Sequence, residues 1–418
     1  MNLLLNNKMY TYLIIGIMSL GFMNSLLYAD IPKSKKSNGN TIIASRDTTA
    51  TIKGNNVSIS MNNRGAFVDY HVRGDSGLTL GKTTAYSDAG VGSMFQGHLW
   101  VSGINSSLSD SLVAVIGDYT DDMHAGEWGS DPTDLKYRIY TVNINMLTQP
   151  ELYTDFQNWP TDQGAPWVDV DGNGTYNPLP NGVDHPKFYG DTVSWYVSAD
   201  GDRAHKLNTG TQPTDLEFQT TVYSFNRPTK APKYDNVIFY RVLLVNKGDD
   251  TLKEVYAGIW ADTDLGDETD DLVGVDVSRS MAYTYNDGAD SKQTAYYNQP
   301  EQSVVLGIDL LQGPMMDCSA DGFIDIILTA IDLDGDPVSI SIVDAPQFGT
   351  IEYRSGSQQT SGTETQTTWR YTPSTNYIGK DSFTYTGMDE SDTSNIGTVG
   401  ISVADVAGEN LPAMVYPN

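Results

Sequence analysis

The segment WVDVDGNGTYNP, residues 167–178, concentrates oxygen-bearing side chains with a spacing that suits a hard cation. Calcium takes six to eight oxygen ligands from a loop in which alternate residues point inward and a glycine permits a sharp turn. Asp169, Asp171 and Asn173 alternate along the segment, and Gly174 occupies the turn position. We therefore predict a calcium site whose ligands are these three side chains and the carbonyl oxygen of Thr175.

The last ligand of this loop is not fixed by the spacing. Counted as an EF-hand loop, the segment has Pro180 where the bidentate glutamate should stand, so a true EF-hand with its flanking helices is excluded. Asp184 or Asp191, further along the chain, could complete the coordination shell. The alternative is a turn rich in aspartate and asparagine that joins two strands and needs no metal.

Two more acidic clusters are candidate calcium sites. Carboxylates so concentrated repel one another unless water or a cation neutralises them. Residues 260–276, WADTDLGDETDDLVGVD, supply as predicted ligands Asp262, Asp264, Asp267, Asp270, Asp271 and Asp276. The segment DLDGD supplies Asp332, Asp334 and Asp336, which would equally form a hairpin corner. In both places the alternative is a solvated acidic loop.

Catalytic motifs are weak, and we expect a protein that is not an enzyme. Ser76, in RGDSGL, lies too close to the N-terminus for a trypsin-like histidine and aspartate to precede it, and the five histidines have no zinc-like spacing. No Gly-x-Ser-x-Gly, His-Glu-x-x-His or P-loop motif occurs. A glycosidase carboxylate pair stays open on chemistry alone. The seven tryptophans and 25 tyrosines could stack on sugars or fill sandwich cores.

Composition limits the partners and the compartment. Acidic residues number 53 against 25 basic ones, a net charge of −28, which argues against nucleic acid and against an anionic membrane surface. The same charge suits an extracellular medium that supplies divalent cations. Cys318 is the only cysteine, so no intramolecular disulfide forms, and we expect its side chain to be buried as a small apolar group.

The N-terminus predicts export. Lys8 precedes the apolar run YLIIGIMSLGFMNSLL, whose core has the length of a signal h-region, and Ala29 suits the last residue of a cleaved leader. We predict a signal peptide over 1–29, a linker over 30–48, and a protein that is secreted or held at the outer cell surface without membrane insertion after cleavage. An uncleaved N-terminal anchor is the alternative.

The rest of the chain predicts an all-β fold, with a large β-sandwich-type domain over 49–316 and a smaller Ig-like β-sandwich over 317–404. The second part has shorter strands with turns at about 8–12-residue spacing, and residues 405–418 leave the strand pattern as a linker. No stretch after the leader has a sustained helical period. Runs rich in β-branched and aromatic residues mark strands at 57–61, 66–72, 112–119, 137–146, 192–199, 216–225 and 236–247.

Two resemblances to known families add to these expectations. Residues 332–403, with DLDGDPVSISIVDAPQFGTI and WRYTPSTNYIGKDSFTYTGMDESDTSNIGTVGISV, resemble the bacterial Ig-like, cadherin-like tandem domain of large surface proteins. That resemblance implies a non-catalytic spacer or adhesion module. The segments GHLWVSG, GAPWVDVDGNGTYNP and LGIDLLQGP are similar to a recurrent exported domain of Bacteroidetes-type surface proteins. Such proteins commonly end in a type IX secretion sorting domain opening with Tyr-Pro-Asn-Pro, so the final VYPN implies a truncated one.

Together these features predict an exported, non-catalytic surface protein of structural or adhesion type that calcium stabilises. Its partner would be an unknown surface partner or glycan. One alternative is a secreted carbohydrate-binding module or a glycoside hydrolase that uses a carboxylate pair, which exposed aromatic residues lining a groove beside paired carboxylates would favour. A second is a self-assembling extracellular layer or filament subunit, because self-association through sheet edges stays open.

Overall fold

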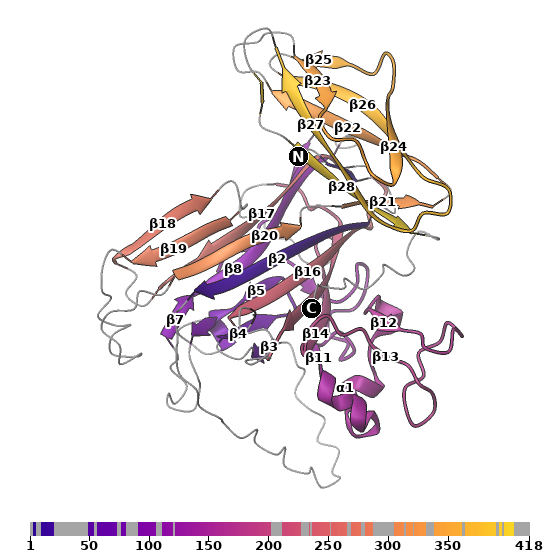
Figure 1. Cartoon of the computed structure of the whole chain (residues 1–418). Coiled ribbons are helices and arrows are strands. Elements are labelled where there is room, and N and C mark those ends of the chain that lie inside the picture. The colour runs from indigo at the N-terminus through magenta and orange to yellow at the C-terminus, as the bar shows by residue number, and fades with distance from the viewer. Residues whose placement is uncertain are drawn as a thin grey trace.

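The computed structural model confirms the all-β fold (Figure 1). Within the residues that the structure describes, no helix is both long enough and apolar enough to cross a bilayer. The described residues are 3–5, 10–20, 49–53, 57–72, 77–80, 91–105, 111–119, 122–201, 211–226, 234, 236–250, 252–265, 269–276, 281–286, 305–312, 315–320, 322–331, 338–361, 364–389, 393–394 and 397–404. The predicted linkers at 30–48 and 405–418 lie outside them.

Two antiparallel sheets form most of the large region. The first has the order β1-β17-β8-β5, with β9 paired to β8. Its strands are Leu3–Leu5 (β1), Ala66–Val68 (β5), Gln96–Asn105 (β8), Ser111–Val115 (β9) and Leu252–Asp262 (β17). The second has the order β10-β14-β15-β16-β2-β20-β19-β18, with β11 paired to β14. Its strands are Tyr10–Leu20 (β2), His124–Ala125 (β10), Tyr140–Asn143 (β11), Thr192–Ala199 (β14), Leu216–Ser224 (β15), Val237–Asn246 (β16), Asp271–Asp276 (β18), Met281–Asn286 (β19) and Val305–Gln312 (β20).

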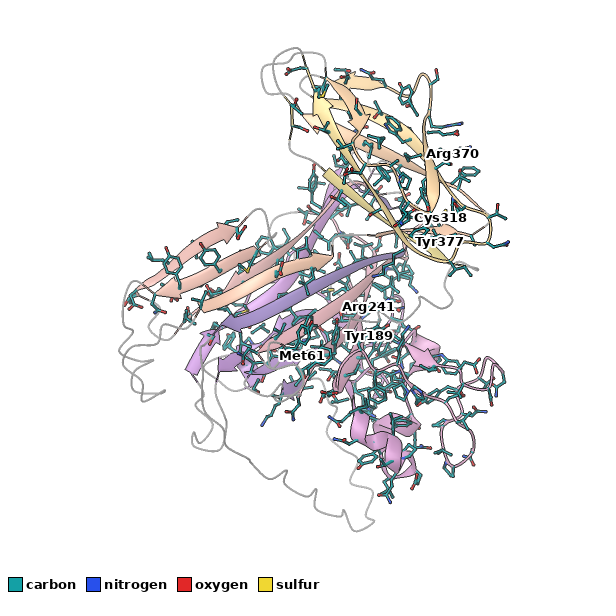
Figure 2. The ribbon with its side chains drawn as sticks, viewed as in Figure 1. Met61, Tyr189, Arg241, Cys318, Arg370 and Tyr377 are labelled. Atoms are coloured by element: carbon teal, nitrogen blue, oxygen red, sulfur yellow. The ribbon has the colours of Figure 1, made fainter. Side chains whose placement is uncertain are left out.

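The two sheets face each other across an apolar core. Phe67 of β5 and Tyr240 of β16 have ring centroids 5.1 Å apart, and the Tyr240 hydroxyl donates to the Phe67 carbonyl at 2.8 Å. A smaller sheet of Thr49–Lys53 (β3), Val57–Asn62 (β4), Leu78–Leu80 (β6) and Val91–Met94 (β7) adds Met61, which is fully buried (Figure 2). Strand β15 is buried on both faces, since Leu216, Phe218 and Val222 are buried and so is Glu217.

Three of the predicted strands end early. The strand predicted over 112–119 stops at Val115. The strand predicted over 66–72 stops at Val68 and continues as a 3₁₀ helix, Tyr70–Val72. The strand predicted over 137–146 is reduced to β11, because the Asn143 side chain accepts from the Asn145 N–H and caps a 3₁₀ helix, Ile144–Thr148. Further short turns of helix follow at Pro150–Leu152, Thr154–Gln157 (α1) and Thr161–Gln163.

The C-terminal part is the predicted Ig-like sandwich of two sheets. They have the orders β21-β28-β27-β23 and β22-β26-β24, with β25 on β26 and β21 parallel to β28. The strands are Met315–Ser319 (β21), Ile324–Ile331 (β22), Ser339–Ile342 (β23), Gly349–Tyr353 (β24), Gln359–Ser361 (β25), Glu364–Pro373 (β26), Gly379–Met388 (β27) and Gly397–Ala404 (β28). Cys318 is buried, as expected of an apolar role (Figure 2).

One buried carboxylate ties this sandwich together. Asp381, in the GKDSFTY segment, accepts from the N–H groups of Gln347 and Phe348 at 2.9 Å each and from the Tyr371 hydroxyl at 2.9 Å. Burial and this bond raise the pKa of Tyr371 well above its usual range. The aspartate of the segment therefore links β27 to β26 and to the turn before β24.

The apolar run that we interpret as a signal h-region forms a central strand. Strand β2 pairs antiparallel with β16, from Met18–Val237 to Tyr10–Val245, and on its other side with β20. Backbone groups inside a sheet need partners, so β2 closes the gap between those two neighbours. A leader removed after Ala29 would take both β1 and β2 with it.

We expect loss of residues 1–29 to open this sheet. A chain that starts at Asp30 leaves β16 and β20 with unpaired edges, which favour pairing with another chain. Compared with the full chain, it should melt about 4 °C lower or more and should self-associate. Light scattering after size exclusion, together with thermal melts, makes the comparison. A monomer with unchanged melting temperature would contradict it.

Candidate calcium-binding loop

A two-stranded hairpin frames the opening candidate. Trp167–Val168 (β12) pairs with His185–Pro186 (β13), Val168 facing His185. Asp169 directly follows the first strand and Asp184 directly precedes the second. The register of the hairpin therefore sets these two aspartates opposite each other at the mouth of the loop.

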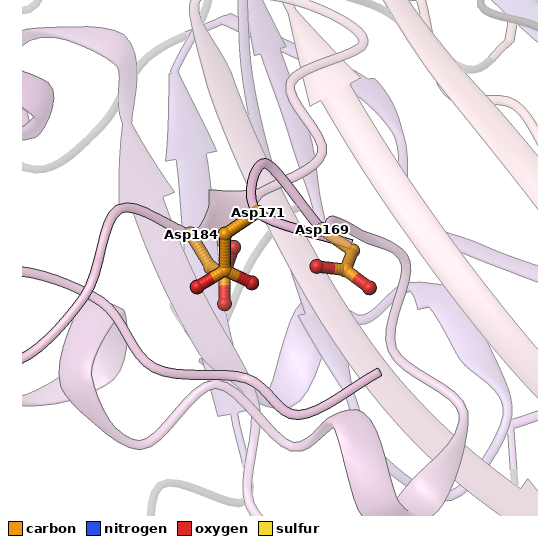
Figure 3. Close-up of side chains that lie close together, drawn as sticks. All are labelled: Asp169, Asp171 and Asp184. Carbon is orange, nitrogen blue, oxygen red and sulfur yellow. The ribbon is translucent and has the colours of Figure 1, made fainter. Parts of the chain in front are cut away.

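Three carboxylates come together there (Figure 3). Asp169, Asp171 and Asp184 each offer an oxygen atom, and these oxygens lie within 4.8 Å of one another. Asp171 is exposed and Asp169 is partly exposed, whereas Asp184 is only 2% exposed. Three like charges at this separation repel, and a divalent cation would relieve that repulsion.

The loop is ordered by its own backbone. Asp169 accepts from the N–H groups of Gly172 (2.8 Å), Asn173 (3.1 Å) and Gly174 (2.7 Å). The two glycines have φ of 73°, a left-handed conformation that favours glycine and turns these N–H groups inward. These bonds, that from Gly174 above all, hold the pKa of the Asp169 carboxyl below its usual range.

Asp184 holds the other side of the loop. Its two oxygens accept from the N–H groups of Val170 at 2.8 Å and Asn177 at 3.0 Å. Below it, the rings of Trp167 and Tyr176 pack edge to face with centroids 5.5 Å apart. The Tyr176 hydroxyl donates to the Phe156 carbonyl at 2.6 Å, and burial raises the pKa of this phenol. The loop thus stands on an aromatic base.

This geometry fits a hard cation, although it equally describes a well-formed turn. The donor set is all oxygen, as calcium prefers, and Asp169, Asp171 and Asp184 converge from both arms of the hairpin. The Asn173 side-chain oxygen instead accepts from the Thr175 N–H at 2.7 Å. Asp191 is not among the converging carboxylates; it directly precedes β14 and accepts from the Asn226 N–H at 2.9 Å.

The other predicted acidic sites are placed differently. Asp271 and Asp270 receive bonds from the Leu265 N–H and the Asn286 amide, both at 2.9 Å, and Asp262 receives one from the Tyr119 hydroxyl. No three of the described carboxylates between 262 and 276 offer ligand atoms within 4.8 Å. This cluster therefore stays a prediction. Outside the described residues lie Asp267, Asp332, Asp334 and Asp336, together with Ser76.

Aromatic residues on β8 and β17 are the functional candidates that sequence reasoning did not single out. Trp159 and Trp195 fill cores, but Trp100 and Trp260 are half-buried on a sheet face. They are stacked, with ring centroids 6.1 Å apart and planes 5° apart. Their positions on paired strands, in GHLWVSG and WADTD, were the available signal.

Comparison with known proteins identifies one part of the chain. Residues 314–402 match the family model described as a bacterial Ig domain, in agreement with the two sheets built from β21 to β28. A comparison with the curated proteins gives no match. The C-terminal part is therefore an Ig-like domain of bacterial type.

The lowered pKa of Asp169 predicts how the metal-free loop responds to acid. A carboxyl whose folded pKa is depressed adds stability that is present above its usual pKa and is lost as pH falls through the lowered value. In chelator, the amide resonances of Gly172 and Gly174 should hold steady down to the usual aspartate range and move only below it. In Asp169→Asn this transition should be absent, and a transition at or above the usual range in the parent protein would contradict the expectation.

Proposed function

We propose that the protein is exported and acts without catalysis at the outer cell surface, in a structural or adhesive role. The observation that carries this proposal is the bacterial Ig-like domain at 314–402, joined to a second, larger β-sandwich region. Domains of this kind serve as spacers and adhesion modules. The signal-like N-terminus and the net charge of −28 agree with such a location. Secretion by the type IX route, which the resemblance to Bacteroidetes-type surface proteins implies, belongs to the same proposal.

Calcium is the proposed structural ligand of the 169–184 hairpin loop. Asp169, Asp171 and Asp184 would hold the ion, which would neutralise three carboxylates that accept from N–H groups of the loop. An ion that binds only the folded loop stabilises the protein by mass action. Its role would be to stiffen a loop that projects from the aromatic base at Trp167 and Tyr176.

A carbohydrate-binding role is the second candidate, because one specific observation favours it. Half-exposed rings line β8 and β17 beside the carboxylate of Asp262, whose Oδ2 lies 2.9 Å from the Tyr119 hydroxyl. Partly exposed rings beside a carboxylate are one part of what we expect of a sugar-binding protein, the other parts being a groove and a second carboxylate. Such a surface would give an adhesive protein its ligand.

Surface location is tested on intact cells of a bacterium that produces the full chain. External protease should remove the protein from intact cells, and the N-terminus of the exported form should be Asp30. The same protease applied after lysis is the control for accessibility. Protein that survives until the cells are broken would contradict the proposal.

Calcium binding is tested by thermal unfolding of the purified protein at about 1 mM calcium and in excess chelator. For a site half-saturated near 10 μM, we expect calcium to raise the melting temperature by about 5 °C or more. The rise should vanish in the double variant Asp169→Ala, Asp171→Ala. It should persist in Asp134→Ala, which removes an exposed aspartate that accepts from the Lys136 N–H at 3.0 Å. An equal melting temperature with and without calcium would remove calcium from the proposal.

A further inference from the structure

One face of the β17–β8 ladder carries a row of partly exposed rings. Tyr256 faces Ser102, Gly258 faces Trp100, and Trp260 faces His98 across the ladder. Paired residues point to the same side of a sheet, so the three aromatic side chains share one face. With Tyr119, which reaches over from the chain after β9, we name Trp100, Tyr119, Tyr256, Trp260 and Gly258 the aromatic ledge.

Three rings of the ledge, those of Trp100, Tyr119 and Trp260, are held in place by their neighbours. Trp100 donates its indole N–H to the Gly117 carbonyl and lies parallel to Trp260. Tyr119 meets Trp260 edge-on, with centroids 5.4 Å apart and planes at 89°. The Tyr119 hydroxyl donates to Asp262 at 2.9 Å, and this bond raises the pKa of the phenol. These three rings are therefore already positioned before a ligand binds.

The space above Gly258, in the middle of the ledge, is open. Gly258 is exposed, and a Cβ atom built on it would meet no heavy atom of the described chain within 4 Å. On either side of it along β17 stand Tyr256, 49% exposed, and Trp260. At the usual strand rise the Cα atoms of these two residues are roughly 13 Å apart, which is longer than a single pyranose ring.

Charge selects among ligands that could lie on flat rings. The ledge is bordered by Asp262, and Asp118 and Asp264 act electrostatically on Tyr119. Carboxylates accept hydrogen bonds from hydroxyl groups but repel sulfate, phosphate and uronate. With the net charge of −28, this favours an uncharged ligand with apolar faces and many hydroxyl donors.

We propose that the aromatic ledge binds a neutral oligosaccharide, the C–H faces of its sugar rings lying on Trp260 and Tyr256 across Gly258 and its hydroxyls donating to Asp262. Aromatic rings offer large, rigid contact area for such faces. The inference rests on the proposed adhesive function and gives it a ligand class.

The test is isothermal titration of the full chain with cellohexaose, xylohexaose and mannohexaose, each uncharged, and with hexagalacturonate as the anionic counterpart. Binding to at least one neutral hexasaccharide is expected. Trp260→Ala should weaken it by roughly tenfold, the effect of one lost aromatic contact. Gly258→Leu should weaken it at least as much, because the new side chain fills the open space while every ring stays.

Two variants control the measurement. Tyr119→Phe keeps the ring and should reduce affinity less than Trp260→Ala. Tyr353→Ala removes a ring that is 43% exposed in the Ig-like domain and should leave affinity unchanged. Circular dichroism and melting temperature establish that each variant is folded. If Trp260→Ala does not fold, the affinity of Gly258→Leu alone tests the proposal.

Three outcomes would contradict the proposal that the ledge binds a neutral oligosaccharide. These are no binding of any neutral hexasaccharide at millimolar concentration, binding of hexagalacturonate alone, or neutral binding that Gly258→Leu leaves intact. Each is distinct from failure of the proposed function. A protein that external protease cannot reach would disprove the surface role while titration in solution still reported on the ledge.

Discussion

The structure depends on which hydrogen-bond donors its carboxylates find, because the chain has too few basic residues to pair with all of them. With 53 acidic residues against 25 basic ones, most carboxylates must find other donors. Backbone N–H groups supply them where segments meet. Asp200, which is fully buried, accepts from the N–H and the hydroxyl of Thr214, both at 2.7 Å. Asp381 does the same between strands of the Ig-like domain. A bond from an N–H to an ionised acceptor is stronger than one between neutral groups, so these contacts fix loops that no disulfide closes.

Aromatic packing is the second interaction that holds the structure, and the role of the rings differs from one part of the chain to another. Below the 169–184 loop the rings are a foundation, since Tyr176 and Trp167 pack into a cluster that continues through Phe156. Elsewhere rings make cation–π contacts. The Arg241 guanidinium lies over the ring of Tyr189, 5.3 Å from its centroid (Figure 2). On β8 and β17 similar rings are left partly open to solvent. The same residue types therefore support a loop in one place and form a partly exposed surface in another.

Sequence reasoning succeeded where the local pattern decides the outcome. The strands at 192–199, 216–224 and 237–246 agree with their predictions because β-branched and aromatic runs of that length have no competing helical period. It failed at 144–148, where one capping side chain, Asn143, diverts the chain into a 3₁₀ helix. In the candidate site, Asp169 and Asp171 followed from spacing, but the choice of Asp184 over Asp191 follows only from the β12–β13 register. Likewise Trp100 and Trp195 are alike in sequence, and only the packing of a second layer buries one of them.

The N-terminal segment shows how one pattern can satisfy two structural demands. A signal h-region and a strand buried inside a sheet are both short, continuous apolar runs, and periodicity cannot separate them. Tyr10–Leu20 meets both descriptions, and the sheet uses it to join β16 to β20. If the leader stays, the sheet is complete within one chain. If it is removed, the backbone groups of both neighbours lose their partners, and unpaired edges of this kind favour pairing with another chain. Cleavage of the leader thus decides whether this sheet is complete within one chain.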